Sequence, residues 1–358
     1  MSNTTAINLY IANLNSLQNN ILRYTYIIIF IAGNIGCFLN ILIFTRQNYR
    51  QLSCSYYILA STFIDLILIN FIILLRILNT FNIDPTQTSL IICKIRMYIA
   101  QAAGVLIRIF IVLACIDRWA MTSRVVKRRA FTNMKIPKIL IPSVIIAYCL
   151  ITMHVPFYQD IVNHRCIITS TNYTTFYNIF NAFISGLVIP MLMIIFSLLT
   201  VRNVRHLQQR VHARVQILVT TNVNEQTVQP QAINKKSYDY QLSFMILIQE
   251  CVYIISNLPF VVYSFYIAIT SSWSKPILQT TIETFSMNII YALLYLNFSS
   301  TFYIYTIASH TFRKDLKQLL SYNRFRSILF GNRQNIEDVS FTQDQIRMRT
   351  RTATVNMP

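Results

Sequence analysis

Residues that interrupt helices are scarce in this chain of 358 residues, which contains five glycines and nine prolines. A membrane β-barrel needs turn residues after roughly every ten positions, so this composition disfavours a barrel and favours long helices. Charge is scarce too, because only 12% of the residues are charged whereas 54% are hydrophobic. A soluble protein of this length needs more charge to cover its surface. The composition therefore predicts an all-α membrane protein.

Patterns that carry enzyme or metal chemistry are also missing. The seven cysteines include no Cys-x-x-Cys pair, which disfavours a zinc site. No nucleophile-base pair, cluster of metal ligands or phosphate-binding loop is evident, so we expect neither an enzyme nor a cofactor. The net charge of +19 could suggest nucleic acid, but the basic residues avoid the apolar blocks and cluster in alternate gaps. That pattern is typical of membrane orientation, so no nucleic-acid partner is expected.

Seven apolar segments are present, each close to or longer than the ~20 residues that a membrane-spanning helix needs. They occupy residues 22–44, 55–79, 91–116, 137–158, 176–201, 241–270 and 284–309. An odd number of spans places the two termini on opposite sides of the bilayer. Of the 31 lysines and arginines, 24 fall in the first, second and third inner gaps or in the C-terminal tail. This asymmetry predicts an outer N-terminus and a cytoplasmic C-terminus.

The predicted organisation is a seven-transmembrane helix bundle with short flanking regions. The gap at about 203–238 is polar and is expected to be a flexible loop. After the last span, Phe312, Leu316 and Leu319 recur at helical spacing with basic residues between them, which predicts a short amphipathic helix on the inner leaflet. The expected regions are an extracellular N-terminus at 1–20, the bundle at 21–309, the surface helix at 310–322 and a disordered cytoplasmic tail at 323–358.

Several short patterns recur in a fixed order along these segments. They are Gly33-Asn34, Asp65, Cys93, Asp117-Arg118-Trp119, Pro190, Pro259, the run from Asn297 to Tyr305, and Phe312-Arg313. In their order and spacing the chain resembles the rhodopsin-like (class A) G-protein-coupled receptors over about residues 20–322. Within that family it is most similar to invertebrate neuropeptide receptors of the FMRFamide type. The resemblance implies a receptor in the plasma membrane that binds an extracellular ligand and activates a heterotrimeric G protein.

The chain also departs from the family pattern. The helix 4 tryptophan is absent, and the Cys-Trp-x-Pro of helix 6 is replaced by Ser256-Asn257-Leu258-Pro259. The Asn-Pro-x-x-Tyr of helix 7 is replaced by Thr301-Phe302-Tyr303-Ile304-Tyr305, and the helix 5 tyrosine by Leu198. The resemblance therefore implies the family's fold, while its usual tryptophan toggle and tyrosine switch are not carried over.

On the outer side, the resemblance implies a disulfide between Cys93 and Cys166, which would tie the second outer loop to the top of helix 3. The alternative is a pair of free thiols. Asn3 and Asn172 begin glycosylation sequons, although three residues alone do not decide whether a sequon is used.

Within the membrane, Asp65 is a buried carboxyl, a feature that is usually functional. Its expected neighbours in a polar core are Asn34, Asn297, Ser300, Thr301 and Tyr305. The resemblance implies a sodium site at this position, but Ile107 replaces the family's helix 3 serine, so fewer oxygen ligands remain. The alternative is a protonated or hydrogen-bonded Asp65 that couples helices 1, 2 and 7.

At the inner end, the resemblance assigns G-protein coupling to Asp117, Arg118 and Trp119. At rest Arg118 would pair with Asp117 and with an acid on helix 6, for which Asp239 stands at the matching distance from Pro259. Ligand binding would swing helix 6 outward and release Arg118. The alternative for Asp239 is a solvated charge at the end of a loop.

The ligand class follows partly from what stands at two diagnostic positions. Ala100 replaces the aspartate of aminergic receptors, and Tyr295 replaces the retinal-binding lysine of opsins. The outer half of the bundle instead offers an aromatic and polar wall, made of Arg76, Gln101, Phe260, Tyr263, Tyr291 and Tyr295. Such a wall suits a short peptide, with Arg76 available to an acidic group. The alternative is packing aromatics with a snorkelling arginine.

Two further intramembrane charges, Arg108 and Glu250, belong to this chain rather than to the family pattern. If Arg118 and Asp239 meet at the inner face, Arg108 and Glu250 lie at nearly the same depth, roughly 15 Å further in, which predicts an ion pair. The alternatives are Arg108 pairing with Asp65, or either residue meeting water. The same charges would also support a different class of protein, a helical channel or transporter, although the broken helices and inverted halves of transporters are not evident.

Overall fold

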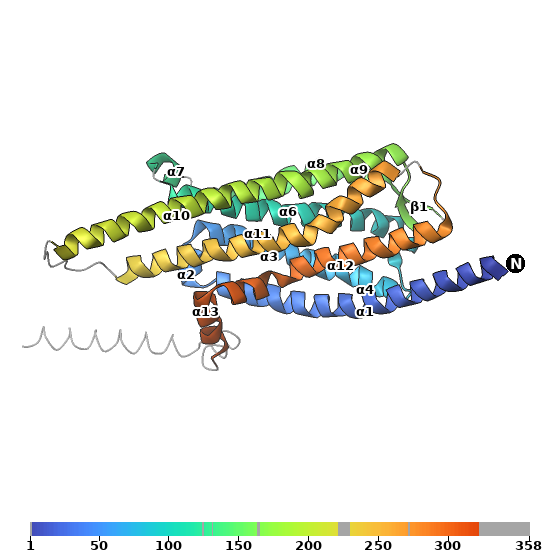
Figure 1. Cartoon of the computed structure of the whole chain (residues 1–358), viewed down its shortest axis with the longest axis horizontal. Coiled ribbons are helices and arrows are strands. Elements are labelled where there is room, and N and C mark those ends of the chain that lie inside the picture. Colours follow the sequence, from blue (N-terminus) through green and yellow to red (C-terminus); the bar gives the residue numbers. More distant parts are fainter. Residues whose placement is uncertain are drawn as a thin grey trace, which may run out of the picture. The chain divides into compact units, whose positions relative to one another are not determined.

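The computed structural model describes residues 2–123, 125–130, 132–162, 165–220, 230–270 and 273–321, with the backbone alone at 2–4, 130, 206–220 and 230–240. The chain divides into two units, Met1–His310 and Thr311–Pro358. The first unit is a bundle of long helices that run lengthwise beside one another (Figure 1). In the second unit, the described residues belong to the end of α13 (His310–Leu320) and Ser321.

The long helical elements of the bundle follow the apolar segments of the sequence. They are α1 (Ser2–Phe44), α3 (Ser53–Leu68) with α4 (Leu74–Thr80), α6 (Leu90–Thr122), α8 (Lys135–Ile151), α9 (Thr171–Phe183) with α10 (Ile189–Thr220), α11 (Pro230–Thr270) and α12 (Ile277–Ala308). Short helices α2 (Gln47–Arg50), α5 (Pro85–Thr88) and α7 (Val126–Ala130) lie in the connections, and a 3₁₀ turn, η2 (Thr152–Tyr158), follows α8. Helix α6 is central and packs against α3, α8, α10 and α11, whereas α12 packs against α1 and α11.

Two of these helical runs are interrupted by π turns. The turn η1 (Ile69–Ile73) joins α3 to α4, and η3 (Ile184–Val188) joins α9 to α10. A π turn closes its hydrogen bond one residue later than an α turn, and such turns are frequent at functional sites. Each run therefore continues as one rod, but its outer part is rotated relative to a regular α-helix.

Six helical stretches within the described residues are long and apolar enough to cross a membrane. They are Thr5–Phe44, Ser53–Thr80, Leu90–Thr122, Lys135–Tyr158, Thr171–Arg205 and Gln241–Thr270. The predicted helical membrane class is thus confirmed. Helix α12 has 32 residues and packs within the bundle, but it is not one of the six. The seventh span therefore stays a prediction.

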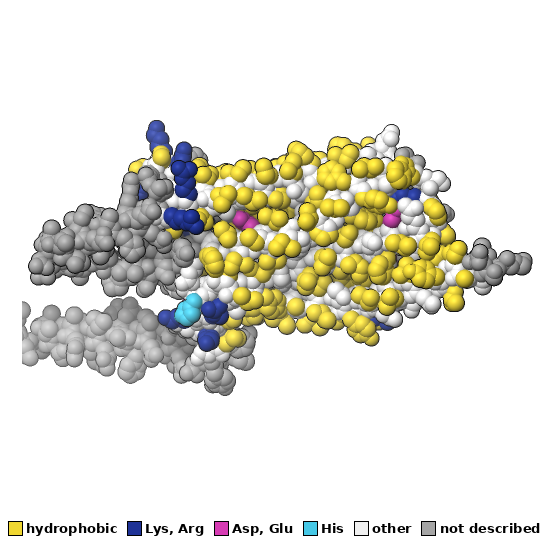
Figure 2. All heavy atoms as spheres, viewed as in Figure 1, with side chains coloured by type: hydrophobic (Ala, Val, Ile, Leu, Met, Phe, Trp, Pro, Cys, Tyr) yellow, Lys and Arg dark blue, Asp and Glu magenta, His cyan; other side chains and the backbone are white. Residues whose placement is uncertain are grey.

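The flank of the bundle has the surface that a bilayer requires. Figure 2 shows hydrophobic side chains over most of this face, with lysines and arginines gathered at the end that carries α7. Large apolar side chains on different helices are strongly exposed, including Ile28 at 64%, Ile146 at 61% and Ile255 at 74%. A soluble monomer rarely exposes a continuous apolar surface of this kind, because water around it is unfavourable. These flanks are suited to contact with lipid.

Some expectations about helix boundaries are wrong. The polar residues 2–20 belong to α1, so this helix begins well before the apolar segment at 22–44, because no glycine or proline precedes Gly33 to interrupt it. The gap at 203–238 is not wholly a loop, since α10 continues to Thr220 and α11 already begins at Pro230. The surface helix predicted at 310–322 corresponds to α13, and the tail at 323–358 lies outside the described residues.

A small antiparallel hairpin is an addition to the all-α prediction, and it lies at the end of the bundle that carries Cys93, which we name the outer end after the predicted orientation. Strands β1 (Gln159–Val162) and β2 (Arg165–Ile168) pair with Ile161 opposite Cys166. Cys166 is bonded to Cys93 of α6, and their Cα atoms are 5.7 Å apart. The disulfide implied by the resemblance is therefore present, and it holds the hairpin to the outer end of the central helix.

Two glycines allow close approach between helices. A Cβ at Gly33 would lie 2.7 Å from Cδ1 of Ile69 and 3.0 Å from Cβ of Ser299, so this position brings α1 against both η1 and α12. A Cβ at Gly186 would lie 2.5 Å from Cγ2 of Val261. The valine side chain is stiff, because two heavy atoms on its Cβ restrict rotation within a helix. The contact between η3 and α11 therefore depends on glycine.

We expect Cys93→Ser to lower the stability of the purified protein by about 2–5 kcal/mol, because the disulfide constrains the 73-residue separation between its cysteines in the unfolded chain. Cys149→Ser is the matched control, since Cys149 is a free cysteine. Thermal unfolding of both variants in detergent, together with surface expression, measures the effect. Equal unfolding temperatures for the two variants would contradict the structural role of the disulfide.

We also expect Gly186→Ala to be destabilising by about 1–3 kcal/mol, because the added methyl group overpacks the contact with Val261. Gly104→Ala is the control, since a Cβ there meets nothing within 4 Å and alanine favours the helix. The first variant should melt at a lower temperature than wild type and the second should not. The packing interpretation fails if both variants melt alike.

Candidate functional site

A cavity of about 140 Å³ lies between the helices in the outer half of the bundle. Its walls come from α3, α4, α6, α9, η3, α11 and α12. Five of the six residues predicted to form the ligand wall line it, namely Arg76, Gln101, Phe260, Tyr291 and Tyr295. The sixth, Tyr263, is not among the lining residues, because its hydroxyl donates a 2.8 Å hydrogen bond to the carbonyl of Glu283 at the start of α12. The predicted wall is therefore mostly one continuous surface.

One side of the cavity is held by a hydrogen-bonded network around Gln101. The Tyr177 hydroxyl donates to the Gln101 side-chain oxygen at 2.8 Å, and the Gln101 amide donates to Asn181 Oδ1 at 2.7 Å. Gln101 is 8% exposed, so these bonds satisfy an amide that is almost fully buried. The network fixes α9 to α6 and orients both side chains of α9 toward the cavity.

The opposite side carries a cation against aromatic rings. The guanidinium carbon of Arg76 lies 5.0 Å from the centre of the Tyr291 ring, a geometry that favours a cation-π interaction. Its Nη1 donates to Asn288 Oδ1 at the long distance of 3.5 Å. The rings of Tyr291 and Tyr295 are stacked with centres 6.3 Å apart, and Phe260 lies 6.2 Å from Tyr291. Arg76 is thus placed by α12 beside the aromatic wall.

Arg108 forms the floor of the same cavity. It is 4% exposed, its Nη2 donates to Asn297 Oδ1, and its guanidinium lies between two rings, 4.0 Å from the Tyr253 centre and 4.5 Å from the Phe298 centre. One side chain therefore ties α6 to both α11 and α12.

The predicted Arg108–Glu250 ion pair is wrong. The Glu250 carboxylate instead accepts hydrogen bonds from Cys115 Sγ at 2.7 Å and from Ser197 Oγ at 2.8 Å. Cys115 lies two turns nearer the inner end than Arg108, about 10 Å along α6. The prediction assumed that equal steps along α6 and α11 reach equal depth, but Glu250 lies level with Cys115. Arg108 and Asp65 form no ion pair within 4 Å in the described structure either.

The polar core is only partly connected. Asp65 is 2% exposed, and its Oδ1 has no hydrogen-bond partner in the described structure. Asn34 accepts a 2.7 Å bond from Asn70 and donates to its own helix at Phe30, while Ser300 donates to the Asn297 carbonyl one turn away. The grouping of Asp65 with these neighbours in one polar core therefore stays a prediction. No group of three or more His, Cys, Asp or Glu residues suited to a metal occurs within the described part of the chain.

A second polar link joins α11 to α12 nearer the inner end. The Tyr305 hydroxyl donates to Gln249 Oε1, and the Gln249 amide lies 3.4 Å from Thr301 Oγ1. Tyr305 and Thr301 were predicted to belong to the polar core, whereas Gln249 was not. The signal for Gln249 was available in the sequence, because Gln249 and Glu250 are adjacent polar residues within an otherwise apolar segment.

Near the C-terminal end of α6, Asp117 and Arg118 form an ion pair with each other. Arg118 Nη2 lies 2.8 Å from Asp117 Oδ2, and Ser53 of α3 donates to Asp117 Oδ1 at 2.6 Å. Trp119 packs on Phe196 of α10, with ring centres 5.4 Å apart. The Asp239 side chain lies outside the described residues, so its proposed part in the latch stays a prediction. A cavity of about 320 Å³ adjoins Arg118 between α6, α10 and α11.

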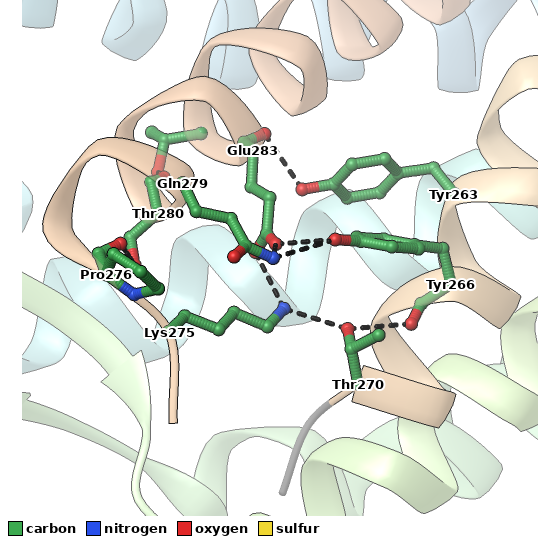
Figure 3. Close-up of polar contacts among 9 residues, drawn as sticks. Tyr263, Tyr266, Thr270, Lys275, Pro276, Gln279, Thr280 and Glu283 are labelled. Atoms are coloured by element: carbon green, nitrogen blue, oxygen red, sulfur yellow. Dashed lines mark hydrogen bonds and ion pairs between the residues drawn. The ribbon is translucent and has the colours of Figure 1, made fainter. Parts of the chain in front are cut away.

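A rim of polar contacts joins α11 to α12 above the cavity (Figure 3). Lys275 Nζ lies 2.8 Å from Glu283 Oε2 and donates to Thr270 Oγ1 at 2.8 Å. Tyr266 and Gln279 also donate to Glu283, at 2.7 and 3.1 Å. These contacts, drawn in Figure 3, engage both oxygens of the Glu283 carboxylate. The rim therefore fixes the outer ends of α11 and α12 to each other.

The two predicted glycosylation positions are Asn3 and Asn172. Asn172 is exposed at the start of α9, as an acceptor for a glycan has to be. The Asn3 side chain lies outside the described residues. Use of either sequon stays a prediction.

Comparison with known proteins places the chain in no established group. No protein-family model matches the sequence, and no curated protein matches it either.

We expect Glu250→Gln to fold with nearly wild-type stability, because the amide oxygen can accept the same hydrogen bonds from Ser197 and Cys115. If Arg108 depended on the charge of Glu250, the same change would strand a buried cation and cost about 3–5 kcal/mol. Thermal unfolding of the purified variant decides between the two. Glu250→Leu is the control, because it removes both acceptors and should be clearly less stable.

Proposed function

We propose that the protein is a rhodopsin-like G-protein-coupled receptor of the plasma membrane, with its N-terminus outside, that binds a short extracellular peptide. The observation that carries the proposal is the arrangement along α6. An aromatic and polar cavity lies at the outer half of this helix, and the buried Asp117–Arg118 pair lies at its inner end. A receptor requires these two sites to be coupled across the bilayer.

Two contacts support such coupling between the sites. Arg108 reaches Asn297 of α12 and the Tyr253 ring of α11 directly below the cavity. Further in, Gln249 of α11 contacts Thr301 and Tyr305 of α12. A ligand that repositions α11 or α12 would change both contacts, and α11 could then move away from Arg118. The proposed mechanism is a shift between two packings of the same helices.

The alternative class, a helical channel or transporter, has its support in the two intramembrane charges Arg108 and Glu250, both of which are buried in the bundle. It can be tested in the same cells as the receptor. The experiment applies pools of synthetic short peptides to cells that express the full chain, and records G-protein dissociation and membrane current in parallel. Peptide-dependent G-protein dissociation supports the receptor. A current that persists when G-protein signalling is blocked, without any dissociation signal, would replace the proposal with the alternative.

We expect Arg118→Ala to abolish G-protein activation by the active pool while the protein still reaches the cell surface, because the freed arginine is the group offered to the G protein. Arg50→Ala is the matched control, since Arg50 is an exposed arginine on the inner side and outside the triplet. The control should signal normally at equal surface expression, as measured by antibody binding to an N-terminal tag. Undiminished signalling by Arg118→Ala would remove the triplet from the mechanism.

A further inference from the structure

We infer that the ligand presents a negatively charged group, of which a carboxylate is the simplest form, to Arg76 in the outer cavity. This inference rests on the proposed receptor function and specifies the chemistry of its ligand. Its main support is an imbalance of charge, because Arg76 and Arg108 both line the cavity whereas none of its described lining residues is acidic. A cavity of this composition repels a cationic group and attracts an anionic one.

Two acids at the outer end are held by other groups, and a third, Asp160, is an exposed residue of β1 that does not line the cavity. Both oxygens of Glu283 accept hydrogen bonds within the rim. Asp84 caps α5, where it accepts bonds from Thr86, Gln87 and Asn79. Burial by itself raises the pKa of Asp84, but these hydrogen bonds outweigh it and hold the pKa below its usual value. Neither acid is available to neutralise Arg76, so this part of the cavity keeps its positive charge. Arg108 differs, because it interacts electrostatically with the buried Asp65.

The two arginines are not equivalent receptors for an anion. The guanidinium of Arg108 is covered by the Tyr253 and Phe298 rings and is bonded to Asn297. Arg76 has one ring contact, one long hydrogen bond to Asn288 and a side-chain hydrogen bond with Tyr295, whereas its Nε has no hydrogen-bond partner in the described structure. Arg76 therefore has donor capacity left, and a planar guanidinium can bind a carboxylate through two parallel hydrogen bonds.

The order in which an entering ligand meets the two arginines follows from the residues of α12 that each arginine contacts. Arg76 lies over Tyr291 and Arg108 over Phe298, which are seven residues apart, so the two cations are separated by about 10 Å along the helix axis. A ligand that enters from outside meets Arg76 first. Arg108 lies below it and strengthens the positive potential without having to release Asn297.

The size of the cavity indicates which part of a peptide enters. Typical ligand pockets measure roughly 300–1,000 Å³, so about 140 Å³ accommodates a terminal group or one side chain rather than a whole peptide. A C-terminal carboxylate and an acidic side chain share the required chemistry. An amidated peptide that carries arginine, the chemistry contained in the name FMRFamide, would instead bring a cation to a cationic cavity. The ligand of this chain therefore differs in charge from what the family resemblance suggests.

The test uses the full-length protein in nanodiscs and pairs of probes that differ only in charge. N-acetylphenylalanine and its amide represent a C-terminal carboxylate, and phenylacetate with phenylacetamide represents a free aromatic acid. An N-acetylglutamic acid amide, paired with N-acetylglutaminamide, represents an acidic side chain. All are titrated at constant ionic strength, with thermal unfolding as the readout. At least one acid should raise the unfolding temperature, while its neutral partner should not.

Variants of Arg76 test whether the acid probe binds at this residue. Arg76→Gln should weaken the acid's apparent Kd by at least about tenfold, and Arg76→Lys should retain part of the affinity because it keeps the charge. Arg165→Gln is the matched control, since Arg165 is an exposed cation of β2 at the same end and does not line the cavity. If Arg76→Gln fails to fold, the ratio between Arg76→Lys and wild type still measures the effect. Equal stabilisation by acids and amides, or undiminished binding of acids by the Arg76 variants, would overturn the inference.

The result of the anion-binding test can be distinguished from the result of the receptor test. Acid binding that depends on Arg76, without G-protein activation by any acidic peptide pool, would support the anion site and contradict the receptor. Conversely, an activating peptide whose acidic groups can all be replaced by amides at unchanged potency would support the receptor and overturn the anion site.

Discussion

A single buried cation, Arg108, determines how the centre of this bundle is arranged. Its charge lies among helices suited to a membrane, where an isolated guanidinium is strongly unfavourable. No acid pairs with it within 4 Å in the described structure, and its stabilisation comes from the Asn297 side-chain oxygen and from two aromatic faces. Each of these partners belongs to α11 or α12, whereas Arg108 belongs to α6. The requirement to solvate one charge therefore fixes three helices relative to one another.

The remaining polar contacts follow from this arrangement. With Arg108 directed toward Asn297, Glu250 faces the other way and is satisfied by Ser197 on α10 and Cys115 on α6. The acid and the base thus have different partners and form no ion pair with each other, although both join α6 to α11. Gln249, adjacent to Glu250, turns toward α12 and reaches Tyr305. Two neighbouring residues of α11 consequently hold it to different neighbours, Glu250 to α10 and α6 and Gln249 to α12.

The helices could be predicted from the sequence alone, but the sequence did not show which residues of neighbouring helices lie at the same depth in the bundle. Apolar segments of membrane length predicted the helical class, because length and hydrophobicity depend only on the local chain. The hairpin at β1 and β2 was not predicted, since strands of four residues are defined by their pairing and by the bond to Cys93 rather than by composition. The error about Arg108 and Glu250 arose from treating α6 and α11 as aligned rods. Residues that line the cavity, such as Gln101 and Tyr291, could be predicted because they are polar or aromatic at positions facing the bundle interior, whereas Tyr263 at the rim could not be distinguished from them.

The π turns η1 and η3 determine which way the cavity-lining residues beside them face. Because η1 lies between Asp65 and Arg76, it separates the deep part of this helical run from the part that lines the cavity. If the residues of η1 were all kept but wound as a regular α-helix, everything beyond the turn would face about 100° away, which would carry Arg76 away from Tyr291 while Asp65 kept its place. The turn η3 divides the neighbouring run in the same way, between Asn181 and Ser197. A change between π and α winding at these two points would therefore reorient the residues that line the cavity without moving the rest of the bundle.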